Sequence, residues 1–221
     1  MVGGRTAPTC QGAPLTGGTA KPLLIYHRGV RATSLDVLPA AGCGKSQLYH
    51  YFDDEADLLG AVIDRQLELV IAAQPALADI ESWPTFDEWL SAILRMHDQP
   101  GGPFACPLGI LAAELKNDES FRPRLDAAFG QWVALLAAGL TRMRAGGELV
   151  AEADPERLAA NVIAALLGGM LLGRVRADIT PMGDAVDAAQ AQLRRWSPSD
   201  VDHRLRPRSA KEHRHGRIAH P

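Results

Sequence analysis

The sequence has few aromatic residues and few cysteines. Only 5% of its 221 residues are Phe, Trp or Tyr, and the three cysteines, Cys10, Cys43 and Cys106, lie far apart. An odd number of widely spaced cysteines argues against a disulfide scaffold. No run of about 18 uncharged apolar residues occurs, so the sequence predicts no membrane span. The N-terminal segment lacks the charged-then-apolar pattern of a signal peptide, so we expect a cytoplasmic protein.

Catalytic and metal-binding motifs do not stand out either. We find no Ser-His-Asp, HExxH or paired-carboxylate arrangement that would indicate an enzyme. Four of the seven histidines fall in the last 25 residues, but their spacing is loose and no cysteine accompanies them. The sequence therefore predicts a protein without enzymatic activity, without a metal site and without a cofactor.

The composition favours helix. The chain is 47% apolar, it is rich in alanine and leucine, and it is long enough to bury a sizeable core. Apolar residues at helical spacing predict one long helix over residues 54–78, with Pro75 kinking or ending it. Further helices are expected from Pro84 onward and over residues 106–116, 119–145, 154–177 and 181–195, with a loop at 100–103. We therefore expect an all-α fold.

Residues 33–52 organise the rest of the chain. They read as a short helix, a turn at Gly42 and a second short helix ending in aromatic residues, which is a helix-turn-helix pattern. Glycine adopts the positive φ that such a turn requires. The second helix would enter the major groove of DNA. An ordinary helical hairpin with an aromatic core stripe is the plainer alternative.

The side chains of this second helix suit DNA. Lysine neutralises phosphate, glutamine pairs with adenine, and phenol or imidazole groups donate to phosphate. We expect Ser46 and Gln47 to face bases, and Thr33 to start the supporting helix. The predicted DNA-contacting residues are Thr33, Lys45, Ser46, Gln47, Tyr49, His50 and Tyr51.

The segment GVRATSLDVLPAAGCGKSQLYHYFDDEADLLGAVI resembles the DNA-binding domain of the TetR family of transcriptional regulators. A second segment, CPLGILAAEL at residues 106–115, is similar to the ligand-domain signature of the LmrA/YxaF-type branch of that family. The resemblance implies an N-terminal three-helix DNA-binding domain followed by a larger helical ligand-binding and dimerisation domain. It also implies that the last long helices form a four-helix bundle between two copies.

These features divide the chain into four parts. Residues 1–18 are rich in Gly, Pro and Thr and are expected to be disordered. Residues 19–65 are the predicted DNA-binding domain, with its first helix at about 20–28. Residues 66–196 are the predicted ligand-binding and dimerisation domain, and 197–221 a disordered basic tail. Charge changes sign near residue 52, inside the predicted DNA-binding domain: residues 19–52 carry +3, residues 53–196 carry −10 and residues 197–221 carry +3. A basic head on an acidic body fits one-sided contact with nucleic acid.

The body should hold a pocket and an interface. Segments 132–140 and 162–172 are apolar on most sides, which suggests an oligomer interface where Gly168 and Gly169 would permit close approach; a monomeric core is the plainer alternative. Ligand sites in helical bundles are apolar with a few polar groups, which suits a small apolar effector. The candidate ligand-binding residues are Trp89, Met96, His97, Phe104, Cys106, Leu111, Phe129, Trp132, Met143 and Met170.

Together these patterns predict a ligand-responsive repressor that binds a palindromic double-stranded DNA operator as a homodimer. Two departures from the family pattern motivate an alternative: Pro39 lies inside the first helix of the motif, and Glu55 stands where a lysine is usual. The alternative is a helical ligand-binding or interaction protein with impaired DNA binding. A third hypothesis is a P-loop NTPase, because Gly44, Lys45 and Ser46 fit the phosphate-binding loop, although Pro39 replaces its first glycine.

Overall fold

The structure is a computed structural model of the chain, and it describes residues 9–10, 13–14, 54–99 and 104–200. Two short strands, β1 (Thr9–Cys10) and β2 (Ala13–Pro14), pair antiparallel with Thr9 opposite Pro14. The disorder expected over residues 1–18 stays a prediction. The predicted helix at 20–28, the helix-turn-helix at 33–52 and the loop at 100–103 lie outside the described residues.

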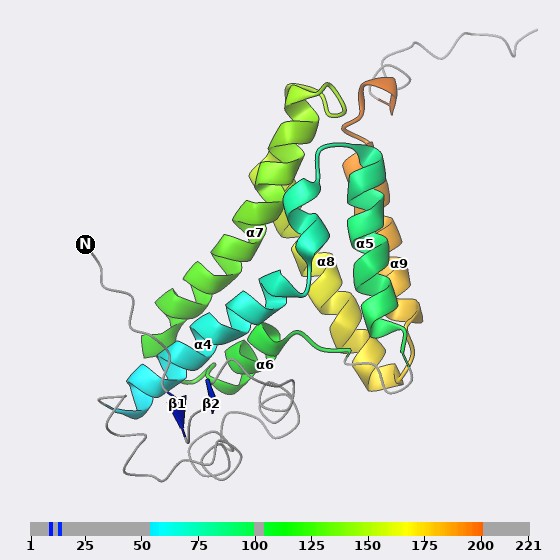
Figure 1. Ribbon diagram of the computed structural model, residues 1–221. Coiled ribbons are helices and arrows are strands. Elements are labelled where there is room, and N and C mark those ends of the chain that lie inside the picture. Colours follow the sequence, from blue (N-terminus) through cyan, green and yellow to red (C-terminus); the bar gives the residue numbers. More distant parts are fainter. Residues whose placement is uncertain (1–8, 11–12, 15–53, 100–103, 201–221) are drawn as a thin grey trace, which may run out of the picture.

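Helices make up nearly all of the described chain, which is all-α in fold class (Figure 1). In order they are α4 (Glu55–Ala72), the 3-10 helix η2 (Pro75–Asp79), α5 (Trp83–His97), α6 (Pro107–Glu114), the 3-10 helix η3 (Glu119–Phe121), α7 (Arg122–Ala145), α8 (Pro155–Arg176) and α9 (Thr180–Arg194). The helices predicted from residue 54 onward are therefore confirmed with corrections at their ends.

The largest correction concerns α4. The predicted helix over residues 54–78 ends at Ala72, and the chain continues from Pro75 as the 3-10 helix η2. Proline lacks the N–H that an α-helix needs, and it disfavours helical geometry in the residue before it. Gln74 accordingly adopts a non-helical conformation, with φ −126° and ψ 57°.

Proline also marks the beginning of most helices. Pro84, Pro107, Pro123, Pro155 and Pro181 stand at the first or second position of α5, α6, α7, α8 and α9. The first N–H groups of a helix have no intrahelical partner, so proline costs nothing there. The start of α4 is different, because Asp54 Oδ1 accepts a hydrogen bond of 2.8 Å from the backbone N–H of Asp57. This side-chain cap replaces proline at the start of α4, which follows the predicted DNA-binding segment in the sequence.

The helices form two groups that share one core. α8 and α9 form an antiparallel hairpin, and α5 packs along α9, whereas α4 and α7 begin together at the opposite side of the molecule (Figure 1). A Cβ at Gly169 would lie 2.8 Å from Cα of Met182, so only glycine allows α8 and α9 to approach this closely. The sequence predicts a close helix approach at Gly168 and Gly169. At Gly169 the approaching helix is α9 of the same chain.

The core joins every helix from α4 to α9. Its largest fully buried side chains include Ile63 of α4, Trp89 of α5, Trp132 of α7 and Leu166 of α8. Burial of such side chains is the main favourable contribution to folding. The core thus connects α4, which follows the predicted DNA-binding segment, to the hairpin of α8 and α9.

Candidate functional site in the helical body

All seven predicted DNA-contacting residues, Thr33, Lys45, Ser46, Gln47, Tyr49, His50 and Tyr51, lie outside the described residues. The structure does describe the acidic residues that follow them. Asp54 caps α4, so this acidic side chain stabilises the start of the helix. Glu55, which departs from the family pattern, is the first residue of α4.

A two-point ion pair holds α4 against α7. Nε and Nη2 of Arg124 donate to the two carboxylate oxygens of Asp64 at 3.0 and 2.5 Å. The hydrogen bond to Asp64 raises the pKa of Arg124, which stays charged. The guanidinium also covers Gly60, where a Cβ would collide with it. Because both side chains are about half exposed, the pair is worth only about 0–1 kcal/mol.

The ten candidate ligand-binding residues all lie within the described helices or directly before α6. Most are buried, namely Trp89, His97, Cys106, Leu111, Trp132, Met143 and Met170, and Met96, Phe104 and Phe129 are half-buried. Six of the buried residues belong to the shared hydrophobic core. They spread over four helices and the segment before α6, so their assignment to one ligand site stays a prediction.

One of these residues has a structural partner that the sequence analysis did not identify. Trp89 Nε1 donates to Oε1 of Gln74 at 3.2 Å, and Nε2 of Gln74 donates to the carbonyl of Val70 at 2.9 Å. Both side chains are buried. The Gln74 amide therefore continues the last turn of α4 and ties it to α5.

Three other buried side chains lack such a partner. Oε1 of Gln66, Nδ1 of His97 and Nε1 of Trp132 have no hydrogen bond within the described residues. Gln66 was missed by the sequence analysis, although a signal exists: it lies between Ile63 and Val70 on the apolar stripe of α4, at three-residue and four-residue spacing.

Burial shifts two titratable groups in this region. Loss of hydration lowers the pKa of His97 below its ordinary value, so its imidazole is neutral at pH 7. Burial also raises the pKa of the Cys106 thiol, and hydrogen bonds from the backbone of Gly109 and Leu108 offset part of that effect. The interior of the body therefore presents neutral polar groups.

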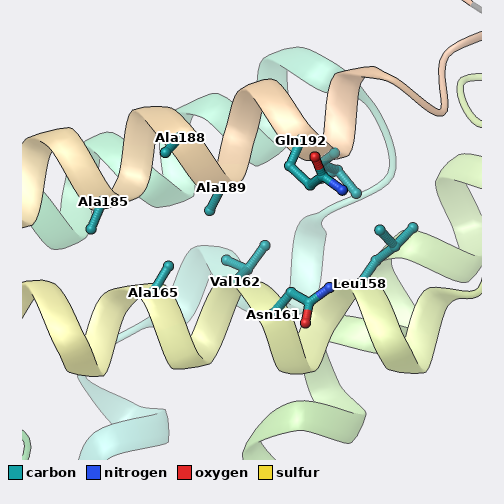
Figure 2. A pocket seen from close by; sticks show the side chains of 9 residues that line it. Leu158, Asn161, Val162, Ala165, Ala185, Ala188, Ala189 and Gln192 are labelled. Carbon is teal, nitrogen blue, oxygen red and sulfur yellow. The ribbon is translucent and has the colours of Figure 1, made fainter.

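A separate pocket of about 350 Å³ lies between α8 and α9. Figure 2 shows its small apolar walls, with Asn161 and Gln192 near one end. The alanines lining it are Ala165, Ala185, Ala188 and Ala189. It contains none of the ten candidate ligand-binding residues, so it is a feature of the outer side of the α8–α9 hairpin.

The same hairpin exposes large apolar side chains. Leu171, Leu172 and Val175 of α8 are 63%, 51% and 76% exposed. By length and composition alone α8 would also pass for a membrane span, although the sequence predicts none. Its other face, however, packs against α7 and α9. The exposed residues form an apolar face that we call the α8 face.

In the described ranges, no group of three His, Cys, Asp or Glu side chains could hold a metal ion. Nor do residues 54–99 and 104–200 contain the parallel sheet that a P-loop NTPase requires. The residues of the P-loop hypothesis, Gly44, Lys45 and Ser46, lie outside the described residues.

Comparison with known proteins identifies the family. Residues 84–189 match the family described as tetracyclin repressor-like, C-terminal domain. An HTH-type transcriptional regulator in the lacX 3′ region of Lactococcus lactis subsp. lactis is 31% identical over 180 residues, which cover 76% of this chain and 87% of that protein. The chain belongs to the TetR family. It is thus a DNA-binding transcriptional regulator with a helix-turn-helix domain and a helical C-terminal domain, and its relatives form a non-enzymatic family.

Other TetR-family proteins agree in sequence and in fold. An HTH-type transcriptional regulator of Mycobacterium tuberculosis is 29% identical over 193 residues, covering 83% of this chain and 93% of that protein. The reduced form of NemR from Escherichia coli superposes with a TM-score of 0.67 at 22% identity, over 77% of this chain and 91% of that one. The regulatory protein TetR from Rhodobacter sphaeroides gives a TM-score of 0.63 at 21% identity, over 76% and 91%. These two structures establish the likeness of fold.

Proposed function

We propose that this TetR-family regulator is a cytoplasmic, homodimeric repressor whose affinity for a palindromic operator is set by a small effector bound in the helical body. The observation that carries this proposal is the path of α4. This single helix starts directly after the predicted recognition segment and continues into the core, where it contacts α6 and α7. A change in the packing of the core therefore moves the element on which the DNA-binding domain is mounted.

The mechanism follows from this connection. Two recognition helices of a dimer must sit about 34 Å apart to enter successive major grooves on one side of DNA. An effector that binds better to a different spacing shifts the population away from the DNA-binding arrangement. The Arg124–Asp64 ion pair transmits such a shift, because it fixes α4 to the start of α7.

The dimer is assigned to the α8 face and the adjoining hairpin. Large exposed apolar side chains gathered on one surface are typical of interaction sites. Small residues next to them, such as Gly168, which has no neighbour within 4 Å of an added Cβ, leave room for a helix of a second copy. We therefore expect the α8–α9 hairpins of two chains to pack together as a four-helix bundle.

DNA binding is tested by fluorescence anisotropy with the full chain and labelled DNA from upstream of its own gene, at several salt concentrations. We expect selective binding over scrambled competitor, with an affinity that falls steeply as salt rises. Lys45→Ala should weaken binding and reduce the salt dependence. Gln47→Ala should weaken operator binding by roughly fivefold or more, with little effect on scrambled DNA. Glu148→Gln on the body is the control and should behave as the parent protein. Nonspecific binding alone would favour the hypothesis that Pro39 and Glu55 impair the DNA-binding domain.

Dimer formation is tested by light scattering after size exclusion. We expect the parent chain to elute as a dimer, and Leu171→Glu or Val175→Glu to shift it to a monomer, because a charge would be buried in an apolar interface. Ala113→Glu, at an exposed position of α6, is the matched control and should remain dimeric. A monomeric parent chain, or a dimer unaffected by both α8 substitutions, would overturn this assignment.

A further inference from the structure

One side of α8 is uncovered along most of its length. Its exposed and half-exposed residues recur at intervals of three or four, so they form one stripe on the helix. In chain order this stripe, which contains the α8 face, consists of Arg157, Asn161, Ala164, Ala165, Gly168, Leu171, Leu172 and Val175. Only the first two side chains are polar. A continuous, mostly apolar surface of this kind is typical of an interface.

The stripe differs in size between its two halves. The residues before Gly168 are small, namely Asn161, Ala164 and Ala165. The residues after it are the large side chains of the α8 face, which project from the helix because each is at least half exposed. A surface with projecting side chains in one half and small ones in the other can be complementary to a reversed copy of itself.

Gly168 is the centre of this arrangement. Leu172 lies four residues after it and Ala164 four residues before it. Val175 and Asn161 lie seven residues after and seven before. Two copies of α8 that cross antiparallel at Gly168 therefore place a large side chain opposite a small one, and two-fold symmetry repeats each match. An added Cβ at Gly168 would meet nothing within 4 Å, so the backbone of a second helix can approach here.

The pocket between α8 and α9 lies in the small half of the stripe. Asn161 and Ala165 line it from α8, and Ala185 and Ala189 line it from α9 (Figure 2). In the antiparallel arrangement, residues 171–175 of a second copy come to lie over this half. The pocket then receives large apolar side chains, which its small apolar walls suit.

The charges at the two ends of α8 favour the same direction. Residues 154–157 contain two acids and one arginine and carry −1, whereas residues 174–178 contain two arginines and one acid and carry +1. Antiparallel packing places the negative end of one copy beside the positive end of the other. Parallel packing would place like charges together, which is unfavourable.

We propose that two copies of α8 cross antiparallel at Gly168, so that Leu171, Leu172 and Val175 of each copy pack on the small half of the stripe and into the α8–α9 pocket of the other. This inference rests on the proposed homodimer, to which it adds the direction and the register of the contact. It also assigns the pocket to a second copy of this chain.

Cysteine cross-linking of the full chain tests the register, in a Cys10→Ser/Cys43→Ser background that retains the buried Cys106. Helix axes 8–10 Å apart bring facing Cα atoms to about 3–5 Å, close to the range of a disulfide. Gly168→Cys should therefore form a covalent dimer on mild oxidation.

Two further cysteine variants separate the antiparallel register from others. Asn161→Cys alone should not cross-link, because its two copies would be about 21 Å apart along the helices, and the same holds for Val175→Cys. Co-expressed, the two variants should cross-link to each other. The control Ala113→Cys, at an exposed position of α6, should give no covalent dimer in either setting.

A size swap tests the complementarity. Leu172→Ala leaves a void at two symmetric contacts, and Ala164→Leu creates two clashes, so each should raise the dissociation constant of the dimer by about tenfold or more. The combined Leu172→Ala/Ala164→Leu chain restores both contacts and should return to within about threefold of the parent. The dissociation constants are measured by sedimentation equilibrium.

Mixing the two single variants gives a second readout. Their heterodimer has one native and one swapped contact, so native mass spectrometry should find about nine-tenths heterodimer, against about half for random pairing. The matched control is Leu135→Ala, the same substitution at an exposed position of α7, which should show no such excess when mixed with Ala164→Leu.

The outcomes separate this inference from the proposed function. A dimeric parent that cross-links through Asn161→Cys alone, or not at all through Gly168→Cys, overturns the register and leaves the homodimer intact. A dimeric parent without rescue in the size swap does the same. A monomeric parent overturns the proposed homodimer and this inference with it. Cross-linking at Gly168→Cys, together with rescue by the size swap, supports both.

Discussion

Two tryptophan substitutions that look alike in sequence should have opposite hydrogen-bonding consequences for stability. Trp89 and Trp132 are both almost fully buried in the same core. Replacing either with Phe removes similar apolar surface and leaves a similar void. The two differ in the indole N–H, because that of Trp89 donates to Gln74 and that of Trp132 has no partner.

The magnitude follows from this difference. Trp89→Phe leaves the side-chain oxygen Oε1 of Gln74 buried and unpaired. This loss costs about 1–3 kcal/mol in addition to the cost of the void. Trp132→Phe removes a buried donor that is already unpaired, which relieves a penalty of about the same size. Since the packing losses largely cancel in the comparison, Trp89→Phe should be less stable than Trp132→Phe by at least about 2 kcal/mol.

The assay is urea unfolding followed by circular dichroism, at one protein concentration because a dimer gains stability with concentration. With a slope of roughly 2 kcal/mol per molar urea, the two midpoints should differ by about 1 M. Equal midpoints, or a lower midpoint for Trp132→Phe, would show that the N–H of Trp132 is satisfied in the folded protein. That result would refute the stability argument.

Three further perturbations test other features. Gly139→Ala should destabilise the protein by about 1–3 kcal/mol in thermal melts, because the new Cβ would lie 2.8 Å from Cβ of Ile80. At Gly130 an added Cβ meets open space, so Gly130→Ala should stabilise the protein by about 0.5–1 kcal/mol. Burial lowers the pKa of His97, so as pH falls the unfolded chain binds a proton at this residue before the folded protein does. Stability should therefore fall as pH drops below about 6.5, and melts of His97→Gln should show a smaller pH dependence. Asp64→Asn should change the melting temperature by little, because the ion pair is half exposed, but it should alter operator affinity; an unchanged affinity would exclude the pair from signal transmission.

The sequence predicted most of the helices because their ends carry strong local signals. Pro84, Asp154 with Pro155, and Gly147 with its φ of +80° are residues whose backbone chemistry sets a boundary without help from the rest of the fold. The end of α4 was placed too late because apolar spacing continues through residue 77, and the structure uses that spacing in a 3-10 helix instead.

The interior of the candidate site was predictable only in part. The burial of His97, Cys106 and Trp132 agrees with their place among apolar residues in the sequence. The burial of Gln66 could have been read from its place on the apolar stripe of α4. The role of Gln74 could not, because glutamine usually faces solvent and the partner of its side chain, Trp89, lies 15 residues away on another helix. Hydrogen-bond pairing depends equally on tertiary packing, so the contrast between Trp89 and Trp132 appears only in three dimensions.

The prolines at the helix starts also limit how the body moves. Because Pro84, Pro107, Pro123, Pro155 and Pro181 supply no N–H, the helices that they open cannot lengthen by winding up the connection before them. These five helices therefore cannot grow at their N-termini. The start of α4 is held by the Asp54 cap, whose loss costs only about 1 kcal/mol. Winding and unwinding is thus open to α4 at the end nearest the DNA-binding domain.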